Sequence, residues 1–227
     1  MSHIQDSDGA DLFSSSFFFA TPAVTAATRQ YRIGPGDRVL QFASLCFDAS
    51  AEEIFPCLAA GATLVLRDEE MLRSATAFLA QCDTWGITVL DLPTAYWAEV
   101  VAEASRNGLK LPAAIREVII GGEPAHAQSL EAWKKVANAR VRLINTYGPT
   151  ETTIVATWHV VDTPDLCAGL EGEIPIGRPV DNVRAYILDA FMHPVPAGVA
   201  GELYIGGPGV ARGYLDHVDA SRECFVA

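Results

Sequence analysis

The sequence predicts an α/β protein: a parallel sheet flanked by helices on both faces, followed by a small and incomplete β subdomain. Short apolar segments alternate with helix-like segments through short loops, which predicts the sheet and its helices. Past about Pro164, extended runs separated by Gly- and Pro-containing turns predict the β subdomain, and no helical pattern is seen there. These runs are residues 174–176, 184–188 and 202–205.

Composition along the chain predicts three regions. Residues 1–30 are rich in Ser, Asp, Thr and Ala without periodicity, so we expect a loose leader with no assigned function. The α/β region is expected over residues 31–163, and the β subdomain over residues 164–227. A secretory signal is not expected, because acidic residues precede the apolar run 17–20 and Pro22 interrupts it.

Strands and helices are predicted to alternate after a turn at residues 34–37. The strands are short apolar runs, namely residues 38–43, 63–66, 88–90, 118–120 and 141–144. The helices lie between them, over residues 51–60, 75–82, 97–104 and 130–137. In 75–82 and 97–104, apolar side chains recur at i, i+3, i+4 and i+7, which places them on one helix face. Because strand–helix–strand units favour parallel strands, a ligand is expected at the carboxyl ends of the strands.

Composition also argues against several classes of function. With 227 residues, 50% of them hydrophobic, the chain can bury a sizeable core. A net charge of −12 argues against nucleic acid and anionic membranes as partners, and no apolar run approaches the roughly 20 residues of a membrane helix. The five cysteines form no C-x-x-C pair, which indicates reduced thiols in a cytoplasmic protein. The histidines lack metal-ligand spacing, and no G-x-S-x-G motif is found.

The chemically richest stretch is residues 142–157, RLINTYGPTETTIVAT. An apolar strand leads into a turn at residues 147–149, and three threonine hydroxyls then surround Glu151. Amides, hydroxyls and a carboxylate at the end of a strand suit a phosphate bound with Mg²⁺, and Tyr147 offers a flat face to a purine. The alternative is a polar loop that only closes a strand.

Three motifs carry a resemblance to a known family. Residues 145–151, NTYGPTE, resemble the nucleotide-binding motif of adenylate-forming enzymes, in the form found in amino-acid adenylation domains of nonribosomal peptide synthetases. Two further motifs follow the order of the family: FDAS at residues 47–50 and GELYIGGPGVARGYL at residues 201–215. The resemblance runs from about residue 31 to residue 226. It implies a flavodoxin-like α/β subdomain that uses ATP and Mg²⁺ to activate an amino acid as aminoacyl-AMP. The product would pass to the phosphopantetheine thiol of a peptidyl carrier protein, beside other synthetase modules in secondary metabolite biosynthesis.

The chain also departs from this family. No Gly/Ser/Thr-rich phosphate loop with a lysine, of the form STGTTGxPKG, precedes residue 47. The ribose-binding aspartate, the hinge and the C-terminal domain with its catalytic lysine are not found either, so a middle section is expected. One alternative is a non-catalytic remnant or excised fragment that at most binds nucleotide weakly. Another, a flavodoxin-like signalling or binding module, leaves three ordered motifs unexplained.

The resemblance assigns the nucleotide site. Thr150 would contact the phosphate and Glu151 would be the metal ligand, so these are the expected catalytic residues. Tyr147 would stack on the adenine. The expected nucleotide-binding residues are Gly121, Gly122, Glu123, Asn145, Tyr147, Gly148 and Thr150. For Gly121–Glu123, the alternative is a tight turn whose acidic residue favours a helix dipole.

The resemblance also assigns the amino-acid pocket. Its expected lining residues are Asp48, Ala49, Glu52, Asp91, Ile119, Gly121, Thr146, Ile154 and Val155. Asp48 would pair with the α-ammonium group of the substrate, although a helix cap is the alternative. We expect the loops at Asp48, Gly121–Glu123 and Tyr147–Glu151 to converge on one cleft.

Two of these pocket positions predict the side chain of the substrate. Glu52 and Asp91 are extra carboxylates in an otherwise small, apolar pocket, and a buried carboxylate without a partner is costly. We therefore expect a basic amino acid, such as lysine, ornithine or arginine. The alternative is that one or both carboxylates turn outward, Glu52 as an early-helix acid.

Overall fold

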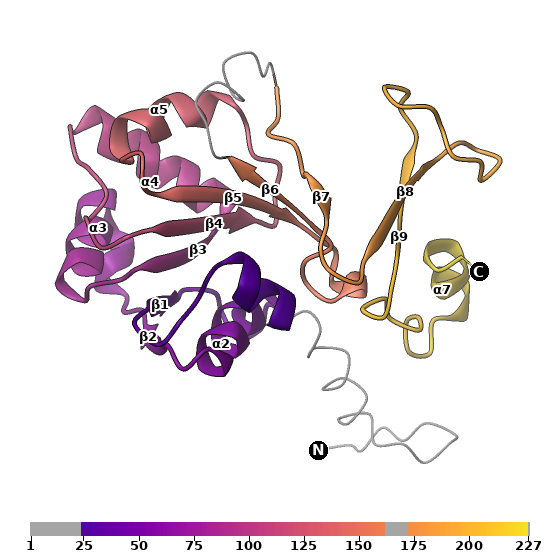
Figure 1. The fold of residues 1–227 in the computed structure, drawn as a ribbon, viewed down its shortest axis with the longest axis horizontal. Helices are drawn as coiled ribbons and strands as arrows, with labels where there is room; N and C mark the ends of the chain where they lie inside the picture. Colours follow the sequence, from indigo (N-terminus) through magenta and orange to yellow (C-terminus); the bar gives the residue numbers. More distant parts are fainter. Residues whose placement is uncertain (1–23, 162–171, 227) are drawn as a thin grey trace.

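The computed structural model describes residues 24–161 and 172–226, and its main feature is a seven-stranded sheet (Figure 1). The strand order is β2-β1-β3-β4-β5-β6-β7. The first five strands of this order, from β2 through β1, β3 and β4 to β5, are parallel to one another. Strands β6 and β7 are antiparallel to their neighbours. The strands are β1 (Arg38–Gln41), β2 (Thr63–Leu66), β3 (Val89–Pro93), β4 (Glu117–Gly121), β5 (Arg142–Tyr147), β6 (Thr157–Val161) and β7 (Arg178–Pro179).

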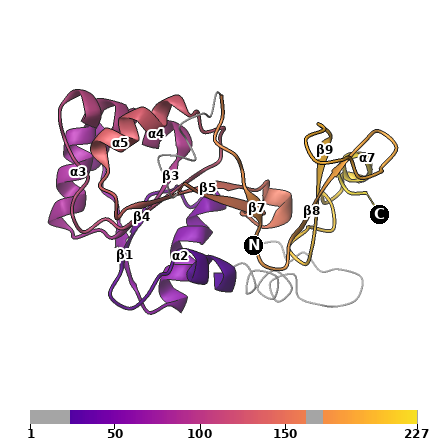
Figure 2. The same cartoon turned by 45° about the horizontal axis from the view of Figure 1, so that its top comes forward.

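Helices cover both faces of this sheet, as predicted (Figures 1 and 2). One face carries α3 (Ala75–Thr84), α4 (Thr94–Arg106) and α5 (Gln128–Val136), and the other carries α2 (Ala49–Ala59) and the helical residues 24–30. Two short 3₁₀ helices, η1 (Glu70–Arg73) and η2 (Thr150–Thr152), lie in the loops.

Alternating strand residues supply the two cores. Val118 and Ile120 of β4 belong to the larger cluster under α3–α5, whereas Ile119 packs with Tyr31 and Ile144 on the face of α2. Each of these side chains is at most 2% exposed. A strand covered on both faces has apolar residues at consecutive positions, which is why β4 has the sequence EVIIG.

The sheet is mixed, which corrects the expectation of a parallel sheet through Val161. Strand β5 extends to Tyr147, beyond the predicted end, and β6 returns beside it in antiparallel register, with Tyr147 opposite Thr157. Only residues 148–156 connect the two strands, whereas a parallel neighbour requires a crossover of a dozen or more residues. The short connection therefore dictates the reversal.

Two predicted boundaries also differ from the structure. Residues 24–30 are already helical and Ala26 is buried, so the ordered region begins before Tyr31. Residues 174–176 form no strand. Ile174 donates its amide to Ala125 at 2.6 Å and β7 pairs with β6, so this segment joins the α/β layer and not the β subdomain. The leader up to residue 23 and the predicted boundary at residues 163/164 lie outside the described residues.

The β subdomain is an antiparallel hairpin with one helix. Strands β8 (Arg184–Leu188) and β9 (Glu202–Gly206) pair throughout, and α7 (Val218–Cys224) follows. The helix α7 was not expected from the sequence, because none of its residues is buried and it therefore has no apolar stripe to recognise. Tyr214 anchors it: its amide donates to Ser221 Oγ at 2.7 Å and its ring meets Phe225 edge-on.

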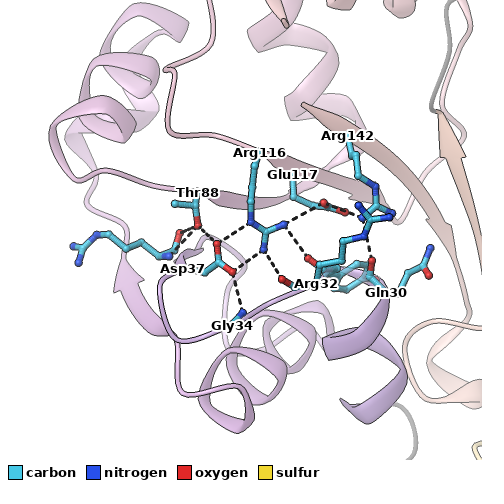
Figure 3. A network of polar contacts seen from close by, with 10 residues as sticks. Gln30, Arg32, Gly34, Asp37, Thr88, Arg116, Glu117 and Arg142 are labelled. Carbon is cyan, nitrogen blue, oxygen red and sulfur yellow. Dashed lines mark hydrogen bonds and ion pairs between the residues drawn. The ribbon is translucent and has the colours of Figure 1, made fainter. Parts of the chain in front are cut away.

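A polar network fastens the amino ends of the strands (Figure 3). Arg116 donates to both carboxylate oxygens of Asp37, at 2.8 and 2.7 Å, while the fully buried Glu117 accepts from Arg116 and Arg142. Partial burial raises the pKa of Asp37, but hydrogen bonds from Arg116 and Thr88 outweigh it and leave this pKa below its ordinary value. The Asp37 carboxylate is therefore ionised and paired.

The same arginines hold the segment that precedes β1. Arg116 donates to the carbonyls of Tyr31 at 3.1 Å and Arg32 at 2.9 Å, and Arg142 donates to that of Gln30 at 3.3 Å (Figure 3). This network fixes Tyr31 against the sheet.

No described helix has the length and apolar character needed to cross a membrane. The described cysteines, Cys46, Cys57, Cys82 and Cys224, are free thiols. Cys167 lies outside the described residues.

Candidate active site

The predicted motif loops meet at the carboxyl edge of the sheet. Thr150 Oγ1 donates to Asp48 Oδ2 at 2.7 Å, although 102 residues separate them. Gly121 ends β4 directly beside Thr146 of β5, where an added Cβ would clash with Thr146 Oγ1 and lie 3.3 Å from its carbonyl oxygen. The convergence of Asp48 and Gly121 on the Tyr147 loop is confirmed.

The geometry at Asp48 argues against the helix-cap alternative. Asp48 occupies the N-cap position of α2, but its side chain makes no capping hydrogen bond. Its carboxylate is instead the acceptor for Thr150. The residue is only partly buried, so the carboxylate remains available to a ligand.

A tight loop positions Thr150 and Glu151. A Cβ at Gly148 would lie 2.7 Å from the amide nitrogen of Ala156, so only glycine fits where the start and the end of this loop approach each other. Thr153 and Ile154 both have left-handed backbone conformations, with φ of +62° and +73°. A β-branched residue in this region costs roughly 1–3 kcal/mol. The loop therefore stores strain beside the site.

The β subdomain holds Glu151 from the other side. The hydroxyl of Tyr214 donates to Glu151 Oε1, and the amide of Ala211 donates to the carbonyl of Glu151 at 2.7 Å. The hydrogen bond from Tyr214 keeps the pKa of the partly exposed Glu151 carboxyl below its usual value. Glu151 is thus an ionised, accessible oxygen ligand, which fits Mg²⁺ held mainly by phosphate oxygens. Among the described residues, no group of three or more His, Cys, Asp or Glu side chains could hold a metal by itself.

Some of the residues predicted to bind nucleotide are exposed at the carboxyl edge of the sheet, and one of them is buried. Tyr147, 38% exposed, lies at the end of β5, and Gly122 and Glu123 are exposed after β4, where Gly122 has φ of +83°. Asn145 does not join them. Its buried amide donates to the carbonyls of Ile174 and Pro175 at 3.3 and 3.0 Å, which tethers the segment before β7.

The predicted amino-acid pocket lies on the sheet face covered by α2. Asp91 pairs in register with Ile119, and Gly121 and Thr146 occupy the same face by strand alternation. A cavity of about 70 Å³ lies on the same face, and three of the expected pocket residues, Glu52, Ile154 and Val155, line it. The other expected residues, namely Asp48, Ala49, Asp91, Ile119, Gly121 and Thr146, are not among its lining residues. Ala49 is partly buried in the first turn of α2.

The cavity has two aromatic walls that the sequence analysis missed. Tyr31 and Trp158 also line it, with ring centroids 6.4 Å apart in an edge-to-face arrangement. Neither residue belongs to one of the three motifs. Tyr31 lies 21 residues from Glu52, so no local sequence pattern indicates that the two side chains meet. The one sequence feature that pointed to Tyr31 was its position as an aromatic residue shortly before the Gly-Pro-Gly turn at residues 34–36.

Glu52 points inward, so the alternative that it turns outward is wrong. It is 8% exposed and accepts a hydrogen bond from the hydroxyl of Tyr31 on Oε1. Burial raises the pKa of Glu52 to about 7; the Tyr31 hydrogen bond opposes this, while the charges of Glu53 and Asp48 add to it.

Asp91 is the least satisfied carboxyl in the site. Burial, together with the charges of Glu52 and Glu53, raises the pKa of Asp91 well above its ordinary value. Within the described part of the chain its Oδ2 atom has no hydrogen-bond partner. Glu53 is different, because its carboxylate accepts from the amides of Phe42 and Ala43 at 3.0 and 2.9 Å and so supports the loop after β1.

Comparison with solved structures defines the class of protein. The fold resembles that of the nonribosomal peptide synthetase FmoA3, with a TM-score of 0.80 and 27% identity over 92% of this chain and 22% of that one. The Klebsiella oxytoca NpsA N-terminal subdomain in complex with 3-hydroxybenzoyl-AMSN shares the fold, with a TM-score of 0.74 and 22% identity over 99% of this chain and 55% of that one. The mixed sheet is that of the N-terminal subdomain of an adenylation domain.

Sequence comparison then identifies the family. The AMP-binding enzyme family matches residues 17–215, so this chain belongs to it. The match begins well before residue 31, where the resemblance was expected to start.

Two relatives show how much of a synthetase the chain represents. The chain is 44% identical over 191 residues to isonitrile lipopeptide synthase of Streptomyces coeruleorubidus, covering 84% of this chain and 12% of that protein. It is 39% identical over 207 residues to bacitracin synthase 3 of Bacillus licheniformis, covering 90% of this chain and 3% of that protein. The chain thus spans a small part of the relatives it matches, as the expected middle section does.

Proposed function

We propose that this chain forms the amino-acid pocket and part of the nucleotide site of an adenylation domain that activates a basic amino acid as aminoacyl-AMP. The hydrogen bond between Thr150 and Asp48 carries the proposal. It joins the carboxylate expected to bind the α-ammonium group to the hydroxyl expected to contact the phosphate. A substrate held by Asp48 therefore has its carboxylate close to the phosphate site, and such positioning is a large part of catalysis.

In the proposed reaction, a carboxylate oxygen of the amino acid attacks the α-phosphorus of ATP. The new P–O bond forms as the bond to the β-phosphate bridging oxygen breaks, and pyrophosphate leaves with the electron pair. Asp48 orients the amine and Tyr147 offers its ring to the adenine. Thr150, whose hydroxyl donates to Asp48 in this structure, would turn that hydrogen to a phosphate oxygen once the ammonium group occupies Asp48. Mg²⁺, which Glu151 would hold, supplies charge neutralisation on the leaving group. The aminoacyl group would then pass to the phosphopantetheine of a carrier protein.

The preference for a basic side chain rests on Glu52 and Asp91. Glu52 is buried, and on the same side of the sheet the Oδ2 atom of Asp91 is buried and lacks a partner within the described residues. Tyr31 satisfies one oxygen of Glu52. A cationic group in the pocket would favour the ionised forms and offset the cost of their burial.

A chimaera tests this proposal, in which residues 24–215 replace the aligned segment of isonitrile lipopeptide synthase. We expect amino-acid-dependent ATP–pyrophosphate exchange that is highest with lysine, ornithine or arginine. Glu52→Gln should weaken selection of these substrates by several-fold or more, while the KM for ATP stays nearly unchanged. Glu99→Gln, an exposed position on α4, is the matched control. A preference of the unmutated chimaera for aliphatic or aromatic amino acids would rule out the basic pocket.

A further inference from the structure

Tyr31 is a buried residue outside the three motifs whose hydroxyl reaches the pocket. It is 1% exposed, lines the cavity with Glu52, and donates its hydroxyl hydrogen to Glu52 Oε1. Among the described residues, Glu52 Oε2 accepts no hydrogen bond. We propose that Tyr31 is a positioning residue of the pocket, which holds one oxygen of Glu52 and leaves the other for a cationic substrate group. The substrate part of this inference rests on the proposed function.

The backbone around Tyr31 is held firmly enough for this role. Its amide donates to the carbonyl of Ala27 at 2.9 Å, and its carbonyl accepts from Arg116 at 3.1 Å. Arg142 holds the preceding carbonyl, that of Gln30 (Figure 3). The ring packs edge-on against Trp158. The network at the amino edge of the sheet therefore fixes a hydroxyl that acts inside the cavity.

The surroundings of Glu52 explain why a donor is needed there. The other ionisable groups whose charges act on it are acidic: Asp48 just before α2, Glu53 in the first turns of α2, and Asp91 of β3. Burial already raises the pKa of Glu52 to about 7, and the hydrogen bond from Tyr31 is the influence that lowers it. Without this hydroxyl, Glu52 would be protonated at neutral pH, and a neutral carboxyl attracts a cation poorly.

Titration of Glu52 tests the role of Tyr31. In chain labelled with carbon-13 at the Glu side-chain carboxyls, and with Glu52→Gln to assign the signal, NMR follows the midpoint of Glu52. Tyr31→Phe should move this midpoint upward by about one to two pH units, which is the loss of one hydrogen bond to a charged group. An unchanged midpoint would overturn the proposal.

Tyr96→Phe is the matched control, because the Tyr96 ring packs against Phe42 and Phe78 on the opposite face of the sheet. It should leave the Glu52 midpoint where it is. If Tyr31→Phe unfolds the chain, 3-fluorotyrosine at position 31 replaces it. This stronger donor should move the midpoint downward, and no movement would again contradict the role.

A second arm separates this inference from the proposed function. Free L-lysine should lower the Glu52 midpoint in the unmutated chain, whereas L-norleucine, of equal length but without the ammonium group, should not. If Tyr31→Phe moves the midpoint and lysine does not, the basic substrate is wrong and the hold of Tyr31 on Glu52 stands. If lysine lowers the midpoint equally in both proteins and Tyr31→Phe alone does nothing, Tyr31 has no positioning role.

Discussion

Glu52 and Glu53 are adjacent in sequence, yet they serve different purposes. Glu53 supports the backbone after β1 through two amide hydrogen bonds, whereas Glu52 faces the cavity with one bond from Tyr31. The resemblance placed Glu52 among the pocket residues, but the sequence left open whether its side chain points inward. Its partner was not, because the contact depends on how the segment before β1 folds back over the sheet.

These two residues predict an unusual dependence of stability on pH. Burial raises the pKa of each to about 7 in the folded chain, against 4.5 when unfolded. Below about pH 4.5 both states are protonated and the stability is fully present. As the pH rises towards 7, the unfolded state loses these protons first, so stability falls through this window.

We therefore expect the melting temperature to fall between pH 5 and pH 8, with a shallower slope in Glu52→Gln. Thermal unfolding followed by tryptophan fluorescence at several pH values measures both. Glu99→Gln removes the same charge from an exposed position and should melt in parallel with the unmutated chain. Equal slopes in Glu52→Gln and the unmutated chain would show that Glu52 does not titrate in this range. Asp37, whose pKa is lowered, acts with the opposite sign and only in more acidic solution.

The helices and strands from α2 to β5 were predicted well because apolar periodicity sets them locally. The helical pattern at residues 75–82 corresponds to α3, and the run 63–66 is β2 without change. The failures had non-local or chemical causes. Strand β6 reverses because its loop is short, and α7 buries no side chain and so shows no pattern.

Arg116 is the residue on which the amino edge of the sheet depends, and its removal should be costly. Arg116→Ala leaves Asp37 without its ion pair and frees the carbonyls of Tyr31 and Arg32. Breaking a buried pair typically costs 3–5 kcal/mol. Since Arg116 is 32% exposed, we expect about 2–3 kcal/mol in urea unfolding with an unchanged m-value.

The control for this prediction is Arg73→Ala. Arg73 pairs with Glu70 on η1, where both side chains are more than 60% exposed, at 69% and 64%. It should change the free energy of unfolding by no more than about 0.5 kcal/mol. Equal losses in the two variants would mean that the network at Arg116 has no special importance.

The ion pairs that stabilise the fold and the expected site residues lie at opposite ends of the strands of the sheet. The charged network lies at the amino ends of its strands, and the loops of Asp48, Gly121 and Thr150 meet at the carboxyl ends. The β subdomain contacts the loops at the carboxyl ends through the hydrogen bond from Tyr214 to Glu151. The place of the site was predictable because parallel strands bring their carboxyl ends together. The Tyr214 contact was not, since it links segments 63 residues apart.

The sequence of this chain contains no Gly/Ser/Thr-rich loop with a lysine before Asp48, which predicts how it behaves alone. Transfer at phosphorus depends on cationic groups that stabilise the charge on the phosphate oxygens. Losing one preorganised contact of this kind typically costs about 10²–10³ in rate. We expect the isolated 227-residue chain to catalyse amino-acid-dependent ATP–pyrophosphate exchange at least about 10²-fold more slowly than the chimaera with isonitrile lipopeptide synthase. The assay compares both proteins at equal concentration over all amino acids, with Thr150→Val in the chimaera as the reference for a damaged phosphate site. Exchange by the isolated chain within tenfold of the chimaera would show that residues already present replace the lysine loop.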